Sequence, residues 1–117
     1  MRERDIQNQI RLSVSEQCPG VIFRTNAGQA WAGDRAYSHE FKQNVLVNIR
    51  PVKLLVPGFS DLMYLGPERN ATFIECKTPK GPVREEQERF IELMKGYGFN
   101  AGICRSVEDA VNLTKRG

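Results

Sequence analysis

The chain has 117 residues, 40% of them hydrophobic and 26% charged, which suits one globular domain with a single core. Its net charge of +3 is compatible with a polyanionic partner but does not require one. No apolar run approaches the roughly 20 residues that a transmembrane helix needs, so we expect no contact with a membrane.

Three cysteines and one histidine limit the metal and redox chemistry of the chain. The cysteines form an odd number without close spacing, so they suit neither a disulfide framework nor a zinc site. We therefore expect a cytoplasmic protein in a reducing compartment. Cys76 and Cys104 lie in apolar runs and are interpreted as packing residues. The histidine, His39, has no sequence neighbour that would orient its ring for acid–base catalysis.

The first part of the chain predicts a helix followed by a strand. Apolar residues recur at intervals of four over residues 3–16, the pattern of a helix with one buried stripe. Pro19-Gly20 ends this helix, and the apolar run 21–24 predicts a strand. The stripe consists of Ile6, Ile10 and Val14.

The next part of the chain has a weaker pattern. Residues 27–40 are rich in glycine, alanine and polar side chains without a clean period, and we predict a loop. Apolar residues then alternate on both sides of Pro51 between positions 45 and 56, which predicts two short strands or an irregular hairpin. Because proline cannot donate to a sheet ladder, Pro51 is expected at a bend or on an edge.

A hairpin is predicted next, and it carries the polar residues of most interest. Its strands are residues 61–65 and 72–77, separated by a glycine-proline turn. Because alternate side chains of a strand share a face, Glu75 and Lys77 point to the same side. Asp61 begins the neighbouring strand, so an acid, an amine and a second acid are expected close together.

Two helices and one strand complete the predicted fold. Pro82 and the acidic residues after it favour the start of a helix that continues to Gly96 or Gly98. Residues 101–104 predict a short strand, and residues 106–115 predict a last helix that opens on a serine N-cap. The order of elements predicts a mixed α/β sheet with helices on its faces.

The predicted cluster of charges suits a hard divalent cation. Two carboxylates about 4 Å apart repel by roughly 4 kcal/mol at an effective dielectric constant near 20. A protein tolerates this when one carboxyl is protonated, when a lysine offsets the charge, or when a cation lies between them. Oxygen ligands without histidine or thiolate favour Mg²⁺ or Mn²⁺. The backbone carbonyl of Cys76 would supply a further oxygen, and Lys77 would orient an attacking water or offset developing charge.

Gln87 lies on the inward stripe of the predicted helix, one turn from Val83 and Phe90. A buried amide needs a hydrogen-bond partner, which either the acidic site or a loop carbonyl would supply. The Glu-x-Lys pattern also occurs as an exposed cross-strand pair, so a non-nuclease α/β domain stays open as an alternative.

Four motifs in this order resemble the VRR-NUC family, the virus-type replication and repair branch of the PD-(D/E)xK nuclease superfamily. They are Glu3 with Ile6-Gln7, then Gly58-Phe59-Ser60-Asp61, then Glu75-Cys76-Lys77, then Gln87. The likeness covers nearly the whole chain and implies a single nuclease domain over residues 1–117. It also implies a restriction-endonuclease-like core with a mixed central sheet flanked by helices. Ser60 stands where a proline often precedes the aspartate of the superfamily.

The resemblance implies a role for each matched residue. Asp61 and Glu75 are expected as metal ligands, Lys77 as the catalytic lysine, and Gln87 as the glutamine that helps to hold the site. Glu3 matches an acid that can complete the metal shell in this family. It is alternatively an ordinary acid of a helix N-terminus, and Asp5 is a neighbour that would take the same place.

Basic and aromatic side chains outside this cluster are candidates for contacts with DNA. The stretch from Trp31 to Lys42 interleaves aromatic rings and cations, as DNA-contacting loops often do, although Trp31 would equally serve as a hydrophobic plug or a dimer contact. The segment after the first strand also resembles the family, or is a solvated strand end. The candidate phosphate contacts are Arg24, Asn26, Arg35, Lys42, Lys80 and Arg84.

These observations predict an Mg²⁺- or Mn²⁺-dependent endonuclease that hydrolyses the phosphodiester bonds of DNA. The resemblance to stand-alone viral and bacterial members implies a structure-selective enzyme of DNA repair, acting on branched DNA such as four-way (Holliday) junctions. It also implies a homodimer, whose two sites would make two matched cuts. The alternative is a non-catalytic DNA-binding module that retains the nuclease fold.

Overall fold

The computed structural model describes residues 1–25, 30–52 and 57–117. The chain divides into two compact units, and each is described by itself. The core unit comprises Met1–Thr25 and Pro57–Gly117, and the ribbon unit comprises Asn26–Val56. Within the described ranges, no helix is both long and apolar enough to cross a membrane.

The core unit is built on a four-stranded mixed sheet in the order β1-β4-β5-β6. Strand β4 is antiparallel to both β1 and β5, whereas β5 and β6 run parallel. The strands are β1 (Val21–Arg24), β4 (Leu62–Gly66), β5 (Asn70–Cys76) and β6 (Asn100–Cys104). The helices are α1 (Glu3–Gln17), α2 (Glu85–Gly96), which connects the parallel pair, and α3 (Val107–Arg116).

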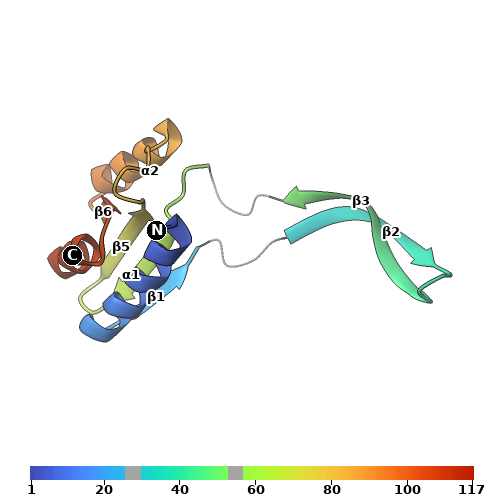
Figure 1. The fold of residues 1–117 in the computed structure, drawn as a ribbon, viewed down its shortest axis with the longest axis horizontal. Helices are drawn as coiled ribbons and strands as arrows, with labels where there is room; N and C mark the ends of the chain where they lie inside the picture. The colour runs from blue at the N-terminus through green and yellow to red at the C-terminus, as the bar shows by residue number, and fades with distance from the viewer. Residues whose placement is uncertain (26–29, 53–56) are drawn as a thin grey trace. The chain divides into compact units, whose positions relative to one another are not determined.

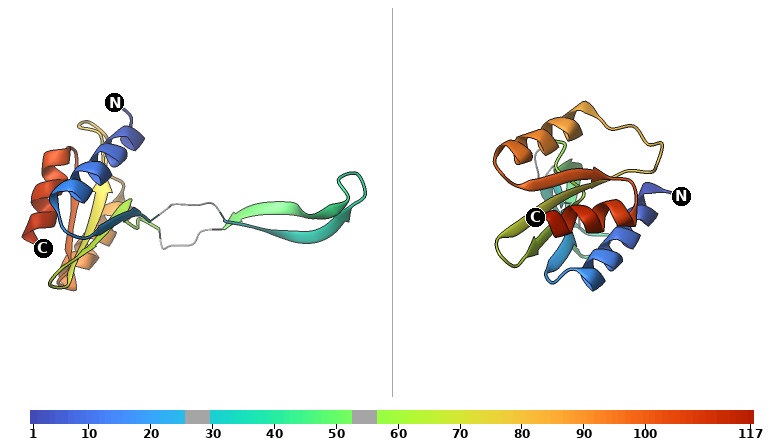
Figure 2. Two further views of the ribbon diagram at one scale, coloured as in Figure 1. Left: turned by 90° about the horizontal axis from the view of Figure 1, so that it is seen from below. Right: turned by 90° about the vertical axis from the view of Figure 1, so that its left-hand side faces the viewer.

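Helices cover both faces of this sheet (Figure 1). Helices α1 and α3 pack on one face, where Ile10 and Ile74 are fully buried in the larger hydrophobic cluster. Helix α2 packs on the other face, where its Phe90 meets Phe73 of β5. Strand β6 lies at the edge of the sheet, with α2 and α3 on either side of it (Figure 2). The predicted fold class, a mixed sheet flanked by helices, is confirmed.

The predicted elements of the core unit are confirmed, with most bounds shifted by one or two residues. Helix α2 begins later than predicted, at Glu85, so Pro82 and Val83 lie in the loop before it and Val83 is not part of its apolar stripe. The apolar stripe of α1 is buried as expected, and Ser106 caps α3 by accepting a hydrogen bond from the Asp109 amide at 3.1 Å. The three cysteines are free and buried. Burial raises the pKa of the Cys104 thiol to about 12, so the prediction that it is a packing residue holds.

The prediction for the ribbon unit was wrong. Of the predicted loop at 27–40, the described residues up to Ser38 form strand β2 (Ala30–Ser38), and residues 27–29 lie outside the described ranges. In place of two short strands or a separate hairpin at 45–56, there is one strand, β3 (Gln43–Val52), which pairs antiparallel with β2. Residues 53–56 lie outside the described ranges. Pro51 is opposite Trp31 in the ladder, on the edge of a two-stranded ribbon rather than at a bend.

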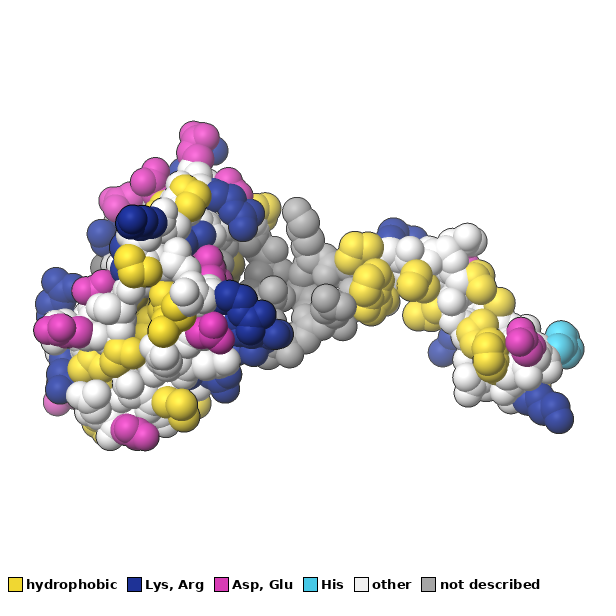
Figure 3. All heavy atoms as spheres, in the orientation of Figure 1, with side chains coloured by type: hydrophobic (Ala, Val, Ile, Leu, Met, Phe, Trp, Pro, Cys, Tyr) yellow, Lys and Arg dark blue, Asp and Glu magenta, His cyan; other side chains and the backbone are white. Residues whose placement is uncertain are grey.

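The lack of a buried face explains why this ribbon has no clear period in the sequence. Hydrophobic alternation arises when one face of a strand packs on a core. Among the described side chains of residues 31–51, none is buried. The register also shifts between Ala32 and Asp34, and Asn48 has a φ of 55°, so a bulge interrupts β3 where alternation was sought. Hydrophobic side chains gather along the ribbon in Figure 3.

Candidate metal centre and catalytic site

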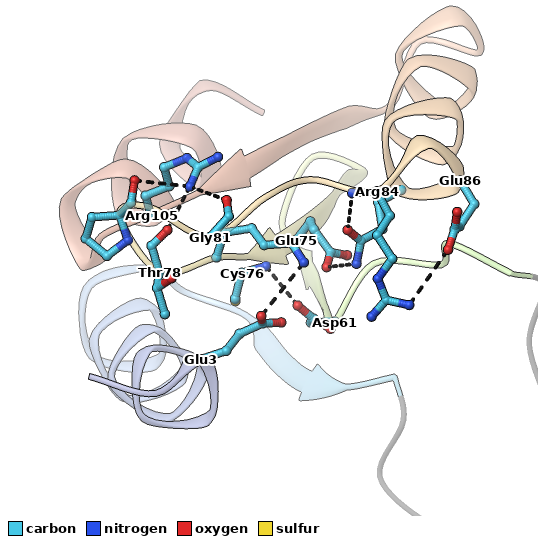
Figure 4. Close-up of polar contacts among 12 residues, drawn as sticks. Glu3, Asp61, Glu75, Cys76, Thr78, Gly81, Arg84, Glu86 and Arg105 are labelled. Atoms are coloured by element: carbon cyan, nitrogen blue, oxygen red, sulfur yellow. Dashed lines mark hydrogen bonds and ion pairs between the residues drawn. The ribbon is translucent and has the colours of Figure 1, made fainter.

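Three carboxylates from distant parts of the sequence converge at one end of the sheet (Figure 4). Glu3 comes from the first turn of α1, Asp61 directly precedes β4, and Glu75 lies near the end of β5. One oxygen of each lies within 4.8 Å of the others. Two oxygens that bind one Mg²⁺ at about 2.1 Å are at most about 4.2 Å apart. Small inward shifts of the side chains would therefore seat a single ion.

Asp61 is held between three strands. Its backbone carbonyl accepts a hydrogen bond from the Thr25 amide at 3.0 Å, next to the end of β1. Its side-chain Oδ2 accepts from the Cys76 amide of β5 at 2.9 Å. The preceding Ser60 is fully buried, and its hydroxyl donates to the Leu62 carbonyl at 3.1 Å. Ser60 thus makes a local hydrogen bond that a proline at the same position could not make, because proline has no hydroxyl group.

Glu75 is the most confined of the three acids, with 1% of its surface exposed. Its Oε1 accepts a hydrogen bond from Gln87 Nε2 at 2.9 Å, whereas its Oε2 has no partner among the described residues. Burial, and next the charge of Asp61, raise the pKa of the Glu75 carboxyl to about 9, although Lys77 acts in the opposite direction. The site is therefore one that holds either a proton or a cation at neutral pH.

Lys77 brings an ammonium group to these acids. It is 4% exposed, and its Nζ lies 3.8 Å from Glu3 Oε2. Its backbone amide donates to the Cys104 carbonyl of β6 at 3.0 Å, which continues the parallel pairing one residue beyond β5. Three carboxylates and one ammonium carry two negative charges in excess when all are ionised. A divalent cation would balance that excess, so the residues present fit Mg²⁺ or Mn²⁺.

Gln87 connects α2 to the acidic cluster. Its side-chain oxygen accepts from the Arg84 amide at 3.0 Å at the start of α2, while its Nε2 donates to Glu75. Of the two partners considered for this amide, the structure shows the acid. The start of α2 also lies against Gly58, because a Cβ at that glycine would be 2.1 Å from the Glu86 carbonyl oxygen.

The other predicted residues lie at various places. Asp5 pairs with Arg2 at 3.7 Å, so Glu3 is the acid of α1 that joins the cluster. Cys76 donates its amide to Asp61, and the role of its carbonyl as a ligand stays a prediction.

The proposed phosphate contacts are more scattered. Arg84 occupies the N-cap position of α2, and its guanidinium pairs with Glu86 at 3.8 Å. Arg24 ends β1, Lys80 is exposed in the loop before α2, and Arg35 and Lys42 are exposed in the ribbon unit. Asn26 lies outside the described residues. His39 lies 5.0 Å from Tyr37, ring to ring, and is exposed.

Arg105 holds the loop before α2 in place, a role that the sequence pattern does not predict. Its guanidinium donates to the carbonyls of Thr78, Pro79 and Gly81 at 2.7, 3.2 and 2.8 Å (Figure 4). It therefore holds the loop that runs from Lys77 toward α2. The available signal was the register: Cys76 and Cys104 are partners in parallel strands, which brings the next residue of each strand together.

Comparison with known proteins agrees with this geometry. The family model described as the VRR-NUC domain matches residues 2–108. The chain belongs to the VRR-NUC family. The matched range includes Glu3 and the four other side chains of the cluster: Asp61, Glu75, Lys77 and Gln87. A search of curated proteins finds no match. Membership confirms the resemblance drawn from the motifs and implies a nuclease that binds DNA. A single domain over residues 1–117 stays a prediction.

The close approach of Gly58 to α2 yields the first prediction. Gly58→Ala would cost about 1–2 kcal/mol for a side chain at a φ of 81°, and would also drive Cβ into the Glu86 carbonyl. Gly98→Ala is the matched control, since Gly98 has a φ of 90° with open space around it. We expect urea unfolding to show a larger stability loss for Gly58→Ala. Equal losses would mean that the contact with α2 does not constrain the fold.

The raised pKa of Glu75 yields a prediction about pH. The folded state binds this proton more tightly than the unfolded state, so the stabilisation is complete below pH 4.5 and is lost as pH rises toward 9. In the presence of EDTA, the free energy of unfolding of the wild type should therefore fall by up to about 1.4 kcal/mol per pH unit between these values, and Glu75→Gln should lack this fall. Urea unfolding at pH values from 5 to 9 measures it. Parallel curves for both proteins would contradict the assignment.

Proposed function

We propose that this VRR-NUC protein is an Mg²⁺- or Mn²⁺-dependent endodeoxyribonuclease that hydrolyses phosphodiester bonds. The observation that carries the proposal is the convergence of Glu3, Asp61 and Glu75 beside a buried lysine. The unpartnered Oε2 of Glu75 supports it further, since a buried carboxylate oxygen without a partner is costly unless a proton or cation satisfies it.

Asp61 and Glu75 would hold the metal ion, with Glu3 and the Cys76 carbonyl as further ligands. When bound, the ion supplies Lewis-acid polarisation of a phosphate and lowers the pKa of water. Gln87 orients Glu75 by donating to its Oε1, which directs the other carboxylate oxygen toward the cluster. This explains why the amide is on the inward face of α2.

Lys77 would act on the reacting phosphate. Its Nζ is in a nearly buried position, where a fixed positive charge stabilises a developing negative charge more strongly than it would in water. Its amine would offset the charge that builds on the phosphate oxygens as the bond to the leaving oxygen breaks. The same ammonium orients the attacking water.

The cations around the site would bind the DNA backbone. Lys80 and Arg84 lie before and at the N-terminus of α2, where amide groups also favour anions. Arg24 ends the strand beside β4. The remaining proposed contacts are Asn26, Arg35 and Lys42.

We also propose a branched DNA substrate, such as a four-way junction in repair, and a homodimer. A core of this size has little surface with which to read a base sequence, so recognition of DNA shape is favoured. Resolution of a four-way junction needs two matched cuts, and a two-fold dimer supplies two sites in related orientations.

Metal binding tests the ligand set. In a calorimetric titration with Mn²⁺, Asp61→Asn and Glu3→Gln should each lower the affinity at least about tenfold, because each removes a ligand rather than an outer contact. Asp5→Asn is the matched control, since Asp5 lies on the same helix but pairs with Arg2. Binding that is unchanged in Asp61→Asn would rule out this centre.

Cleavage tests the catalytic lysine. With Mg²⁺ or Mn²⁺, the wild type should cut labelled four-way junctions, and Lys77→Ala should lower the rate by about 10²–10³-fold with DNA binding retained. Lys95→Ala, which removes an exposed lysine paired with Glu92 at 3.5 Å, should cleave normally. If the wild type and Lys77→Ala bind alike and neither cleaves, the protein is a non-catalytic DNA-binding module. Preference for duplex or flap over the junction would reject the branched substrate alone.

A further inference from the structure

The ribbon unit exposes far more apolar surface than a two-stranded sheet can carry alone. Six large hydrophobic side chains of the ribbon are between 40% and 66% exposed: Trp31, Tyr37, Phe41, Leu46, Val47 and Ile49. An isolated two-stranded ribbon is marginally stable in water and needs a third layer on a hydrophobic face. Since no described side chain of residues 31–51 is buried, the ribbon has no core of its own.

The strand register sorts these side chains onto two faces. Directly opposite residues share a face, so Leu46 lies with Arg35, and Trp31 lies with Pro51. Ile49 belongs to the same side despite the bulge, because a Cβ on Gly33 would lie 3.3 Å from its Cγ2. This side, called the apolar face, carries four of the six large side chains: Trp31, Tyr37, Leu46 and Ile49. The opposite face carries Val47, which pairs with Asp34.

We propose that the apolar face is the surface through which two copies of this chain associate, with the ribbons stacked face to face. The proposal rests on the homodimer of the proposed function and specifies its interface. Two stacked ribbons form a small two-layer sheet, which gives each ribbon the layer that it lacks.

The available area matches what such an association needs. An aromatic side chain buries about 150–250 Å² when fully covered, and the two rings here are about half exposed. With the two aliphatic side chains and the backbone between them, the face offers on the order of 500 Å² per copy. Two copies would bury about 1,000 Å², which is the lower bound for a specific interface.

The net charge of the ribbon is small, so its apolar face suits a protein partner better than DNA, while Arg35 and Lys42 stay proposed phosphate contacts. Arg35, Lys42 and Arg50 are offset by Asp34 and Glu40, so residues 31–51 carry a net charge of only +1 (3 − 2, with His39 neutral). A surface that binds the DNA backbone carries clustered cations. Here two of the four large side chains of the apolar face, Leu46 and Ile49, are aliphatic, which does not suit contacts with phosphates.

The two strands also contribute complementary shapes. The rings of Trp31 and Tyr37 come from β2, whereas the branched chains of Leu46 and Ile49 come from β3. A two-fold axis parallel to the ribbon lays β2 of one copy over β3 of the other. Each residue then faces its own ladder partner in the other copy, so Trp31 lies over Pro51 and Leu46 lies over Arg35. The rings of Trp31 and Tyr37 reach Ile49 and Leu46 diagonally, two residues along the strand.

Sedimentation of the full chain, in EDTA and without DNA, tests the proposal with two charge variants. Leu46→Glu places a charge on the apolar face opposite Arg35, and Val47→Lys places one on the other face opposite Asp34. Each new charge is paired within its own ribbon, so both variants should keep the ribbon. We expect a wild-type dimer, at least a tenfold weaker dimer for Leu46→Glu, and an unchanged dimer for Val47→Lys. Mn²⁺ affinity should be the same in all three.

The other outcomes overturn the proposal in distinguishable ways. If all three proteins are dimers, the interface lies elsewhere and the homodimer stands. If Val47→Lys also dissociates, the apolar face is not the specific surface. If the wild type is a monomer at about 100 µM, a concentration at which even a weak dimer would form, both the homodimer and its interface are wrong. In that case, loss of junction binding in Trp31→Ala assigns the face to DNA, and unchanged binding assigns it to contacts within the chain. Cleavage assays report on the nuclease proposal separately.

Discussion

The arrangement of the core unit depends on one buried carboxylate. Glu75 lies near the end of β5, and its position in this central strand shields its carboxylate from water. Its neighbours then determine its state: Asp61 and Glu3 disfavour a further negative charge, while Lys77 and the Gln87 amide favour it. Because these effects oppose each other at short range, the group is poised to exchange a proton for a cation. The proposed metal site would need this electrostatic balance in order to bind a cation.

The fold delivers this condition through a few backbone contacts. The β4–β5 hairpin brings Asp61 to the Cys76 amide, and the parallel pairing of β5 with β6 carries Lys77 one residue beyond the sheet. Gly58 lets the chain pass close to the first turn of α2, and this contact helps to position Gln87 relative to the acidic cluster. Arg105 ties down the intervening loop through three carbonyls. The site is thus positioned by the helices and strands of the core unit and by the contacts between them.

The sequence predicted those helices and strands that have a buried face, because burial produces a hydrophobic period. Every helix and strand of the core unit packs one face on a core, so its period could be read, and the parity of Glu75 and Lys77 followed from strand geometry alone. The ribbon could not be read because its faces are exposed and its ladder is interrupted near Asn48. The role of Arg105 could not be predicted for another reason. Its partners are backbone carbonyls, which any residue has, so the side chains of the loop give no sign of the contact. The register of β5 and β6 shows that the two segments lie together.

The two units are incomplete in physically different ways. The core unit brings three carboxylates together at one point, which a small hard cation would satisfy. The ribbon unit has excess apolar surface, which only another surface satisfies. Whatever binds a folded state and not the unfolded one stabilises that state by an amount that grows with the logarithm of its concentration. The order of the site should therefore respond to divalent cations, and the order of the ribbon to protein concentration. Because charge and apolar area are satisfied by different partners, the two responses are separable within one chain.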